Sequence, residues 1–407
     1  MAIYLVSLIV FTAVVAVLVG ILLLIEGRVV RKGDRDIVIN DDEEKRLKVA
    51  SGMTLLSALV SNDVLLPSAC GGSGSCGMCR CRVLSGGRDI MPTELSHLSR
   101  AEIRDNVRVA CQVKVREDMR IRIPDEIFHI QRYSATVVSN ANVASFIKEL
   151  VLRLDEGQAI DYRSGAYMQI DVPEYEASFK QFKIAEKFRD IWDRFDLWKF
   201  KIRAEAPVYR AYSMASAPGE DLLRFTIRIA TPPPLAGEDV PPGVGSSYVF
   251  HLNPGDRVVL SGPYGDFFIK DTDREMCFVG GGAGMAPMRS HILHELGTNH
   301  TKRRMSFWYG ARSRKEMFYD EEFTALAEEH PNFSYHVALS EPQPEDDWKG
   351  LVGFIHQCLY EEHLESHPDP SEIEYYLCGP PPMIEAVEKM LDDLGVDPDM
   401  ITYDKFG

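Results

Sequence analysis

Four cysteines of the chain have the spacing of a metal-binding set. Cys70, Cys76 and Cys79 follow one another in a glycine- and serine-rich segment, and Cys111 lies further along the chain. Thiolates are soft ligands that suit zinc or iron–sulfur sites. Zinc ribbons usually carry paired C-x2-C knuckles, whereas one run of three cysteines with a distant fourth fits a [2Fe–2S] loop. We therefore predict that these four cysteines bind a [2Fe–2S] cluster, with zinc, disulfides or inert thiols as the alternatives.

The same segment contains a fifth cysteine and several glycines. Cys81 could replace Cys79 as a ligand, but the two-residue gap after Cys76 favours Cys79, and we expect Cys81 to be a free thiol. Glycine permits positive φ and lets backbone N–H groups approach the sulfides closely. We therefore expect positive φ, and backbone N–H groups close to the sulfides, at Gly71, Gly72, Gly74 and Gly77.

A second group of residues has the chemistry to hold a flavin dinucleotide. Arg210, Tyr212 and Ser213 end a predicted strand and offer a cation for a pyrophosphate, an aromatic ring for the isoalloxazine and a hydroxyl near its N5 atom. Strand alternation places Arg210 and Tyr212 on one face, although surface strands often have this pattern. Downstream, small residues open a predicted helix whose N–H groups and dipole end can hold a phosphate. These small residues are Gly243, Gly245, Ser246 and Ser247.

Two further segments fit a site for a second dinucleotide. A glycine cluster follows a predicted strand, and Pro287 lies near the start of the next predicted helix. Glycines at the carboxyl end of a strand fit the crevice of a dinucleotide-binding sheet. The glycines are Gly280, Gly282 and Gly284. Near the end of the chain, Cys378 and Gly379 lie at the carboxyl end of another predicted strand, where the alternative interpretation of Cys378 is a small buried hydrophobe.

The first residues of the chain predict a membrane anchor. The 24 residues from Ala2 to Ile25 carry no charge, and a helix of that length spans roughly 36 Å, enough for a hydrocarbon core of ~30 Å. A signal peptide is the alternative, but no basic residue precedes the run, and Arg28, Arg31 and Lys32 follow it. By the positive-inside rule the bulk of the chain is then cytoplasmic, where structural disulfides are rare. Because the span has no ionisable group, we expect an anchor and not an ion pathway.

Beyond the anchor, the pattern of apolar residues predicts three domains. Mixed strands with a short helix indicate an α+β domain, a run of alternating strands indicates an antiparallel β-barrel, and strands alternating with helices indicate a doubly wound α/β domain. The predicted boundaries are 1–26 for the anchor, 27–35 for a linker, and 36–128, 129–270 and 271–407 for the domains. The net charge of −16 argues against a nucleic-acid binder.

The order of these motifs resembles a known family. The Arg-x-Tyr-Ser motif at 210–213, the two glycine segments and the Cys-Gly-Pro motif at 378–380 occur in the order of the ferredoxin–NADP reductase superfamily. The N-terminal part resembles a [2Fe–2S] ferredoxin, which implies a β-grasp fold for 36–128. With the leading apolar segment and the C-terminal YDKFG, the whole chain resembles the F subunits of bacterial sodium-translocating NADH:quinone oxidoreductases.

The resemblance implies a role for each motif. The Arg-x-Tyr-Ser motif would hold FAD, with Gly243–Ser247 at its pyrophosphate, and Gly280–Gly284 would bind the pyrophosphate of NADH. Cys378 would lie near the nicotinamide C4 atom. Phe406, the penultimate residue, would cover the flavin until the nicotinamide displaces it.

The resemblance also implies an electron path in the bacterial inner membrane. NADH would reduce FAD, single electrons would pass through the [2Fe–2S] cluster to other integral membrane subunits, and quinone would be the final acceptor. A membrane-anchored NAD(P)H reductase of an oxygenase system and a non-enzymatic membrane scaffold are the alternatives. The family uses NADH, but Arg312 and Arg314 follow the second strand of the α/β domain, where a 2′-phosphate of NADPH could bind. The aromatic stretch 179–200 is either a docking surface or core packing.

Overall fold

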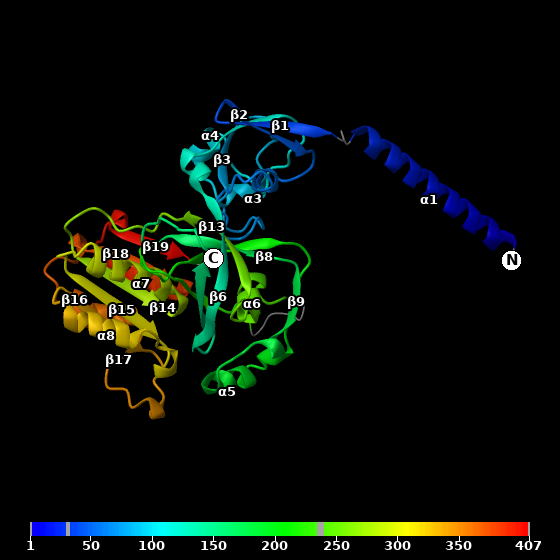
Figure 1. The fold of residues 1–407 in the computed structure, drawn as a ribbon. Coiled ribbons are helices and arrows are strands. Elements are labelled where there is room, and N and C mark those ends of the chain that lie inside the picture. The colour runs from blue at the N-terminus through cyan, green and yellow to red at the C-terminus, as the bar shows by residue number, and fades with distance from the viewer. Residues whose placement is uncertain (1, 30–32, 234–239, 406–407) are drawn as a thin grey trace. The chain divides into compact units, whose positions relative to one another are not determined.

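The computed structural model describes residues 2–29, 33–233 and 240–405 (Figure 1). By its contacts the chain divides into two compact units. The first unit consists of Met1–Pro67 with Gly72–His129, and the second consists of Ser68–Gly71 with Ile130–Gly407.

The N-terminal segment forms one helix, α1 (Ala2–Val29). Within the described residues, no helix combines the length and the apolar character that a membrane crossing requires. The prediction of a helix is therefore confirmed, and the prediction that it crosses a membrane is not.

The first unit is built on a mixed five-stranded sheet in the order β2-β1-β5-β3-β4. Strands β1 and β5 are parallel, and the other neighbours are antiparallel. The strands are β1 (Asp34–Ile39), β2 (Asp42–Ala50), β3 (Arg80–Ser85), β4 (Val107–Val109) and β5 (Met119–Arg122). Three short helices accompany them: α2 (Leu55–Val60), α3 (Pro92–Leu95) and α4 (Arg100–Arg104). In β5 buried and exposed residues alternate as expected for a strand with one buried face, and the predicted α+β domain is present.

Helix α2 begins directly after Thr54. Thr54 is its N-cap, and the Thr54 side chain accepts a hydrogen bond from the backbone N–H of Ser57. Leu55 and Leu59 of this helix are fully buried. The helix therefore packs its apolar face into the core of the first unit.

The second unit begins with a six-stranded antiparallel sheet in the order β11-β8-β13-β6-β7-β12. These strands are β6 (Gln131–Ala144), β7 (Ile147–Leu154), β8 (Tyr167–Val172), β11 (Val208–Ser213), β12 (Leu223–Arg228) and β13 (Arg257–Tyr264). Met168 and Ile170 of β8 and Val249 of α6 (Val244–His251) belong to its core. Where the chain is described, the edge strands meet only through an isolated bridge between Met214 and Phe225. The antiparallel sheet is confirmed, while closure into a barrel stays a prediction.

The aromatic stretch 179–200 packs mostly into a core. It contains α5 (Glu186–Arg194) and is flanked by the paired strands β9 (Tyr175–Ser178) and β10 (Lys201–Ala204). Phe179, Phe188 and Trp192 are fully buried, and the indole N–H of Trp192 donates to the Ser145 carbonyl at 2.7 Å. Phe195 differs from them, because its side chain is 46% exposed. Core packing is therefore the better interpretation of the stretch.

The rest of the second unit is a six-stranded parallel sheet in the order β17-β16-β15-β14-β18-β19. The strands are β14 (Met276–Gly281), β15 (Met305–Ala311), β16 (Phe333–Leu339), β17 (Leu351–Val352), β18 (Glu374–Gly379) and β19 (Ile401–Lys405). The main helices are α7 (Met285–Leu293), α8 (Asp320–Glu329), α9 (Ile355–Leu359) and α10 (Pro381–Asp393).

Helices cover both faces of this parallel sheet. Phe278 of β14 packs in one core with residues of α7 and α8, and its neighbours Cys277 and Val279 pack in another core with residues of α9 and α10. Every residue of β14 and β18 is buried, as expected for strands covered on both faces. The predicted doubly wound α/β fold is thus present. The strand order reverses between β14 and β18, which is where such sheets bind their ligands.

Candidate cofactor sites

The cysteine loop brings thiols together in the first unit. Hydrogen bonding with Cys111, burial and the nearby Cys76 raise the pKa of the Cys79 thiol well above its usual range. All eight cysteines of the sequence lie in the described ranges and none forms a disulfide, so the disulfide alternative is not supported. Cys79 and Cys111 are buried, whereas Cys70 and Cys76 are half-buried.

The glycines of this loop adopt the predicted backbone conformation. Gly71, Gly72, Gly74 and Gly77 all have positive φ, between 64° and 88°. At Gly77 a Cβ atom would lie 2.5 Å from the Cβ of His97, so a larger residue does not fit. The loop is held from outside, because His97 Nε2 lies 2.9 Å from the Gly74 carbonyl and Arg80 Nε donates to the Gly77 carbonyl at 3.0 Å.

Within the described ranges, no three His, Cys, Asp or Glu side chains are arranged to hold a single metal ion. In a [2Fe–2S] cluster the four cysteines are shared between two irons, so such a cluster does not require three side chains around one ion. The thiol donors and the positive-φ loop fit a cluster of this kind. The four-cysteine ligand set remains a prediction.

Cys81 is the cysteine near the loop that is not a predicted ligand. Its side chain is buried on β3 at 3% exposure, and burial raises the pKa of its thiol to about 12. A neutral, buried thiol on the strand that leaves the loop agrees with the expectation of a free cysteine.

The flavin motif and the helix-opening segment meet in the second unit. Arg210, Tyr212 and Ser213 lie on β11, and Gly243 is the N-cap of α6. A Cβ atom at Gly245 would lie 2.5 Å from Arg210 Cγ and 2.7 Å from the Tyr212 hydroxyl. The first turn of α6 therefore lies directly against the face of β11 that carries Arg210 and Tyr212, as alternation predicted.

Several donors at this junction suit a pyrophosphate. The Arg210 guanidinium donates to the carbonyl of Tyr209 at 2.8 Å, and no carboxylate among the described residues forms an ion pair with it. The Ser247 hydroxyl is fully buried and lacks a hydrogen-bond partner in the described chain. Ser246 Oγ instead closes the turn, by accepting from the Ala230 N–H at 3.0 Å and donating to the Gly243 carbonyl at 3.2 Å.

The hydroxyl of Ser213 donates to a carboxylate that the sequence analysis did not identify. Ser213 Oγ lies 2.6 Å from Asp404 Oδ2. Asp404 is on β19, where it is the register partner of Cys378 on β18. Desolvation raises the pKa of Asp404, while the Ser213 hydrogen bond partly opposes the rise. The alternating sequence ITYDK could have predicted a strand at 401–405. It could not have predicted that Asp404 contacts Ser213, because that contact depends on how the strands are arranged in the fold.

A cavity of about 470 Å³ opens at the switch point of the parallel sheet. Gly281 and Gly282 line it beside Pro380, which follows the Cys378-Gly379 pair. Arg312, Ser340, Phe354 and His356 extend the lining away from the glycines. The cavity thus joins the segments that were predicted to bind a dinucleotide.

Other predicted residues lie in the same segments as the cavity-lining residues but do not line the cavity themselves. Cys378 is fully buried, and burial and Asp404 raise the pKa of its thiol well above the usual range, so it stays a neutral S–H group. A Cβ atom at Gly284 would lie 2.1 Å from the Cys378 carbonyl oxygen, which explains a glycine there. Gly280 and Pro287 are buried in β14 and α7 and do not line the cavity. Phe406 lies outside the described residues.

Both arginines considered for a 2′-phosphate already have partners. Arg312 forms an exposed ion pair with Glu341 at 2.9 Å. The backbone N–H of Arg314 donates to the Asp346 carboxylate at 3.1 Å, and its guanidinium donates to the Asp346 carbonyl at 3.1 Å. These contacts favour NADH over NADPH, because a 2′-phosphate near Arg312 would also meet the Glu341 carboxylate.

The sheet topology, the dinucleotide cavity and the cysteine loop define a class of protein, an iron–sulfur flavoprotein reductase that uses a nicotinamide dinucleotide. Residues 38–116 match the family described as 2Fe-2S iron-sulfur cluster binding domain, and residues 278–389 match the oxidoreductase NAD-binding domain. The structure is similar to the cytochrome P450 reductase GcoB of Amycolatopsis, with a TM-score of 0.64, 25% identity and coverage of 91% of this chain and 98% of that chain. The ferredoxin reductase of carbazole 1,9a-dioxygenase gives a TM-score of 0.58 at 24% identity, covering 93% and 99% of the two chains.

Relatives that match 98% of this chain identify a particular family within this class of reductases. The chain is 51% identical over 398 residues to the F subunit of the Na(+)-translocating NADH-quinone reductase of Actinobacillus succinogenes, covering 98% of this chain and 97% of the relative. It is 50% identical over 402 residues to the corresponding F subunit of Neisseria gonorrhoeae, covering 98% of each. The chain belongs to the family of F subunits of Na(+)-translocating NADH-quinone reductases. The predicted cofactors, a [2Fe–2S] cluster, FAD and NADH, are confirmed.

Proposed function

We propose that this chain is the NADH-oxidising, electron-input subunit of a sodium-translocating NADH:quinone oxidoreductase. A flavin is needed between NADH and the cluster, because NADH delivers a hydride and a [2Fe–2S] centre accepts one electron at a time. The observation that carries the proposal is that the chain matches 97% of the length of an F subunit at 51% identity and contains both the cysteine loop and the dinucleotide cavity.

The residues of the second unit have separate tasks in this proposal. Arg210, the first turn of α6 and the Ser247 hydroxyl bind the FAD pyrophosphate. The Tyr212 ring packs against the isoalloxazine, and Ser213, fixed by Asp404, presents its hydroxyl near the N5 atom. Gly281 and Gly282 let the NADH pyrophosphate approach the backbone. Cys378 is the residue proposed to lie near the nicotinamide C4 atom. Phe406 covers the flavin when the nicotinamide is absent.

Cys70, Cys76, Cys79 and Cys111 are the proposed cluster ligands. Cys76 and Cys111 lie close enough to Cys79 to affect its thiol, and this proximity supports three of the four. The plant-type loop has four residues in its first gap, whereas this chain has five between Cys70 and Cys76. Cys70 is proposed as the fourth ligand from its place in the same loop.

We further propose that α1 anchors the chain in the bacterial inner membrane with the bulk of the chain on the cytoplasmic side. The support is the uncharged run Ala2–Ile25 and the exposed apolar side chains along α1, such as Phe11 and Val17. Sodium coupling and quinone reduction then belong to other integral membrane subunits, because this run contains no ionisable residue.

Purification of the full chain in detergent tests the function directly. Iron, inorganic sulfide, zinc and FAD are measured first, and NADH is then added anaerobically. We expect iron and sulfide with FAD, loss of flavin absorbance, and the EPR signal of a reduced [2Fe–2S] cluster. Zinc in place of iron and sulfide, or flavin bleaching without the EPR signal, contradicts the proposal. Extraction of membranes with carbonate tests the anchor, since an anchored chain stays in the pellet.

A further inference from the structure

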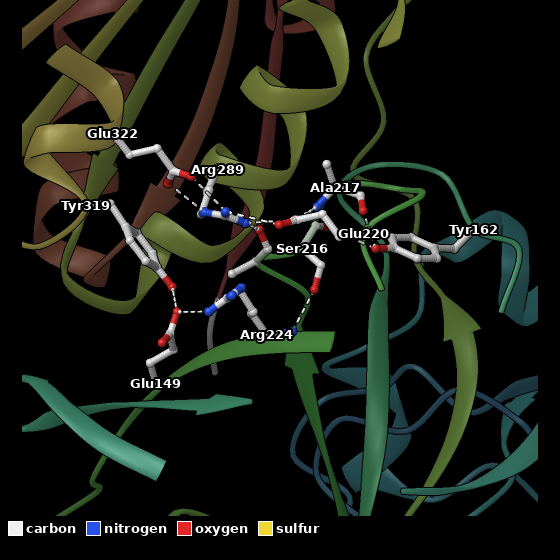
Figure 2. A network of polar contacts seen from close by, with 10 residues as sticks. Glu149, Tyr162, Ser216, Ala217, Glu220, Arg224, Arg289, Tyr319 and Glu322 are labelled. Atoms are coloured by element: carbon white, nitrogen blue, oxygen red, sulfur yellow. Dashed lines mark hydrogen bonds and ion pairs between the residues drawn. The ribbon is translucent and has the colours of Figure 1, made fainter. Parts of the chain in front are cut away.

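Arg289 lies at the centre of a partly buried polar network in the second unit (Figure 2). It is on α7, four residues after Met285 begins the helix, and its side chain is only 7% exposed. Its guanidinium has five N–H donors, and all five have acceptors. Nε donates to Glu322, Nη1 donates to Glu220 and to the Ala215 carbonyl, and Nη2 donates to both glutamates.

These five bonds connect two parts of the second unit. Glu322 belongs to α8 and receives bonds of 2.7 and 2.8 Å from Arg289, so this pair lies within the nucleotide-binding part. Glu220 and the Ala215 carbonyl belong to the antiparallel part and receive bonds of 2.9, 3.2 and 2.8 Å. Burial opposes ionisation of Arg289, but Glu322 and Glu220 outweigh it and raise the pKa of the guanidinium. Arg289 is therefore a permanent cation shared by both parts.

The backbone that Arg289 holds is the continuation of the flavin strand. Ala215 lies two residues after Ser213, the last residue of β11. The chain then forms a tight turn, in which Glu220 also accepts a 2.6 Å hydrogen bond from the N–H of Ala217. The hydroxyl of Tyr162 donates to the carbonyls of Ser216 and Ala217 at 3.2 and 2.9 Å. Arg289 thus binds a segment whose conformation is also held by hydrogen bonds from Tyr162 and to Glu220.

A second set of hydrogen bonds also connects these two parts of the second unit. Tyr319, which precedes α8, donates its hydroxyl to Glu149 of β7, and Glu149 also pairs with Arg224 at 3.1 Å. The backbone N–H of Arg224 donates to the Ser216 hydroxyl at 2.6 Å, which returns the network to the segment that follows β11. Figure 2 shows Arg289 and Tyr319 approaching the residues of the antiparallel part from the same side.

The place of Arg289 in the fold gives the network a role in the reaction. The glycine loop that precedes Met285 lines the dinucleotide cavity, and Arg289 is one helical turn behind it. The other end of the network lies next to Ser213. A displacement of α7 relative to β11 therefore moves the nicotinamide relative to the flavin, and hydride transfer is sensitive to such displacement.

We propose that Arg289 is a positioning residue for hydride transfer, which holds the nucleotide-binding helix α7 in register with the flavin strand β11 through Glu220 and the Ala215 carbonyl. This inference rests on the proposed function of the second unit. It differs from a purely structural role, because it predicts a slower chemical step in a protein that is folded and loaded with FAD.

The test compares Arg289→Lys with Arg303→Lys in the full-length holoprotein. Lysine keeps the charge but has three N–H donors in place of five, so it cannot serve both glutamates and the Ala215 carbonyl in the same geometry. Arg303 is a matched control, because it is also buried and donates to Glu374 at 2.6 Å and to the carbonyls of Arg274 and Lys270, none of which belongs to β11 or to the segment that follows it. FAD content, thermal midpoint and the rate constant of flavin bleaching at saturating NADH are measured.

We expect Arg289→Lys to lower that rate constant by on the order of tenfold to a hundredfold with FAD still bound. Arg303→Lys should lower the thermal midpoint and leave the rate constant within about twofold of wild type. The proposal is overturned if Arg289→Lys bleaches at the wild-type rate, or if both variants slow bleaching equally. If Arg289→Lys does not fold, Glu220→Gln tests the proposal instead, because Glu220 lies on a partly exposed turn. Glu220→Gln should lower the rate constant of flavin bleaching less than Arg289→Lys, again with FAD still bound. Wild-type protein that fails to bleach at all rejects the proposed function instead.

Discussion

The two units of the molecule build their candidate sites in different ways. In the first unit, Cys76 and Cys79 belong to one short loop whose glycines set the backbone, and Cys111 joins them from outside the loop. In the second unit, Ser213 and Asp404 are 191 positions apart in the sequence. Ser213 Oγ lies 2.6 Å from Asp404 Oδ2 only because folding brings strand β11 of the antiparallel sheet next to strand β19 of the parallel sheet. A local site depends mainly on which donors it contains, whereas an assembled site depends on how the fold aligns them. The loss of one donor should therefore abolish the first site, and small displacements should slow the second.

The largest expected effect is the loss of the cluster in Cys111→Ala. Removal of one of four thiolates leaves an iron without its ligand, so iron and sulfide content and the EPR signal should fall to the background. NADH-dependent flavin bleaching should persist, because the second unit has its own core. Cys81→Ala is the control, since Cys81 is equally buried on β3 and is not a proposed ligand. A variant at position 111 that keeps its cluster removes Cys111 from the ligand set.

This contrast also explains which parts the sequence could predict. The positive φ of Gly77, the helix start at Gly243 and the strand-to-helix turn at Gly280–Gly284 all depend on a few neighbouring residues, and all three were predicted correctly. Asp404 and Arg289 were missed, because their partners come from other layers and no local periodicity encodes a sheet register or a contact between two sheets. The predicted closure of the antiparallel sheet into a barrel would depend in the same way on pairing between strands that are distant in the sequence.

The next effect concerns the packing of the dinucleotide loop. In Gly284→Ala the new methyl group would lie 2.1 Å from the backbone oxygen of Cys378, and backbone cannot move aside as a flexible side chain can. We expect destabilisation of about 1–3 kcal/mol and a loss of roughly a hundredfold in kcat/KM for NADH. Thermal unfolding and steady-state reduction of an artificial electron acceptor measure the two effects. Gly297→Ala is the control, since no heavy atom lies within 4 Å of its added Cβ, and equal losses in both variants would count against the packing argument.

A smaller effect is expected from Asp404→Asn, which keeps an acceptor for the Ser213 hydroxyl and removes the charge. The folded pKa of Asp404 is raised by desolvation, so between the usual carboxyl pKa of about 3.9 and the raised value the folded state binds more protons than the unfolded state. Stability therefore falls as the pH rises through this window, and the fall is absent in Asp404→Asn. The wild-type thermal midpoint should approach that of the variant on acidification below the window.

The rate of flavin bleaching supplies a second measurement on Asp404→Asn. The loss of a charge-assisted hydrogen bond at the flavin side should slow bleaching at neutral pH by about tenfold. The FAD content should not change, because the residues proposed to bind the pyrophosphate are elsewhere. Identical pH profiles of wild type and variant would mean that Asp404 does not titrate in this window, and loss of FAD would mean that the carboxylate has a binding role.

The smallest effect is expected at the end of the cavity that Arg312 lines. In Glu341→Gln the Arg312 guanidinium loses its ionic partner and becomes available to a 2′-phosphate. Both side chains are more than half exposed, so the change is worth about 1 kcal/mol at most, or up to about fivefold in kcat/KM for NADPH, with little change for NADH. Glu345→Gln removes the same charge from an exposed residue nearby that does not pair with Arg312, and separates a local effect from a change in overall charge. An equal gain in both variants would show that the long-range field, and not the Arg312–Glu341 pair, sets the preference for NADH.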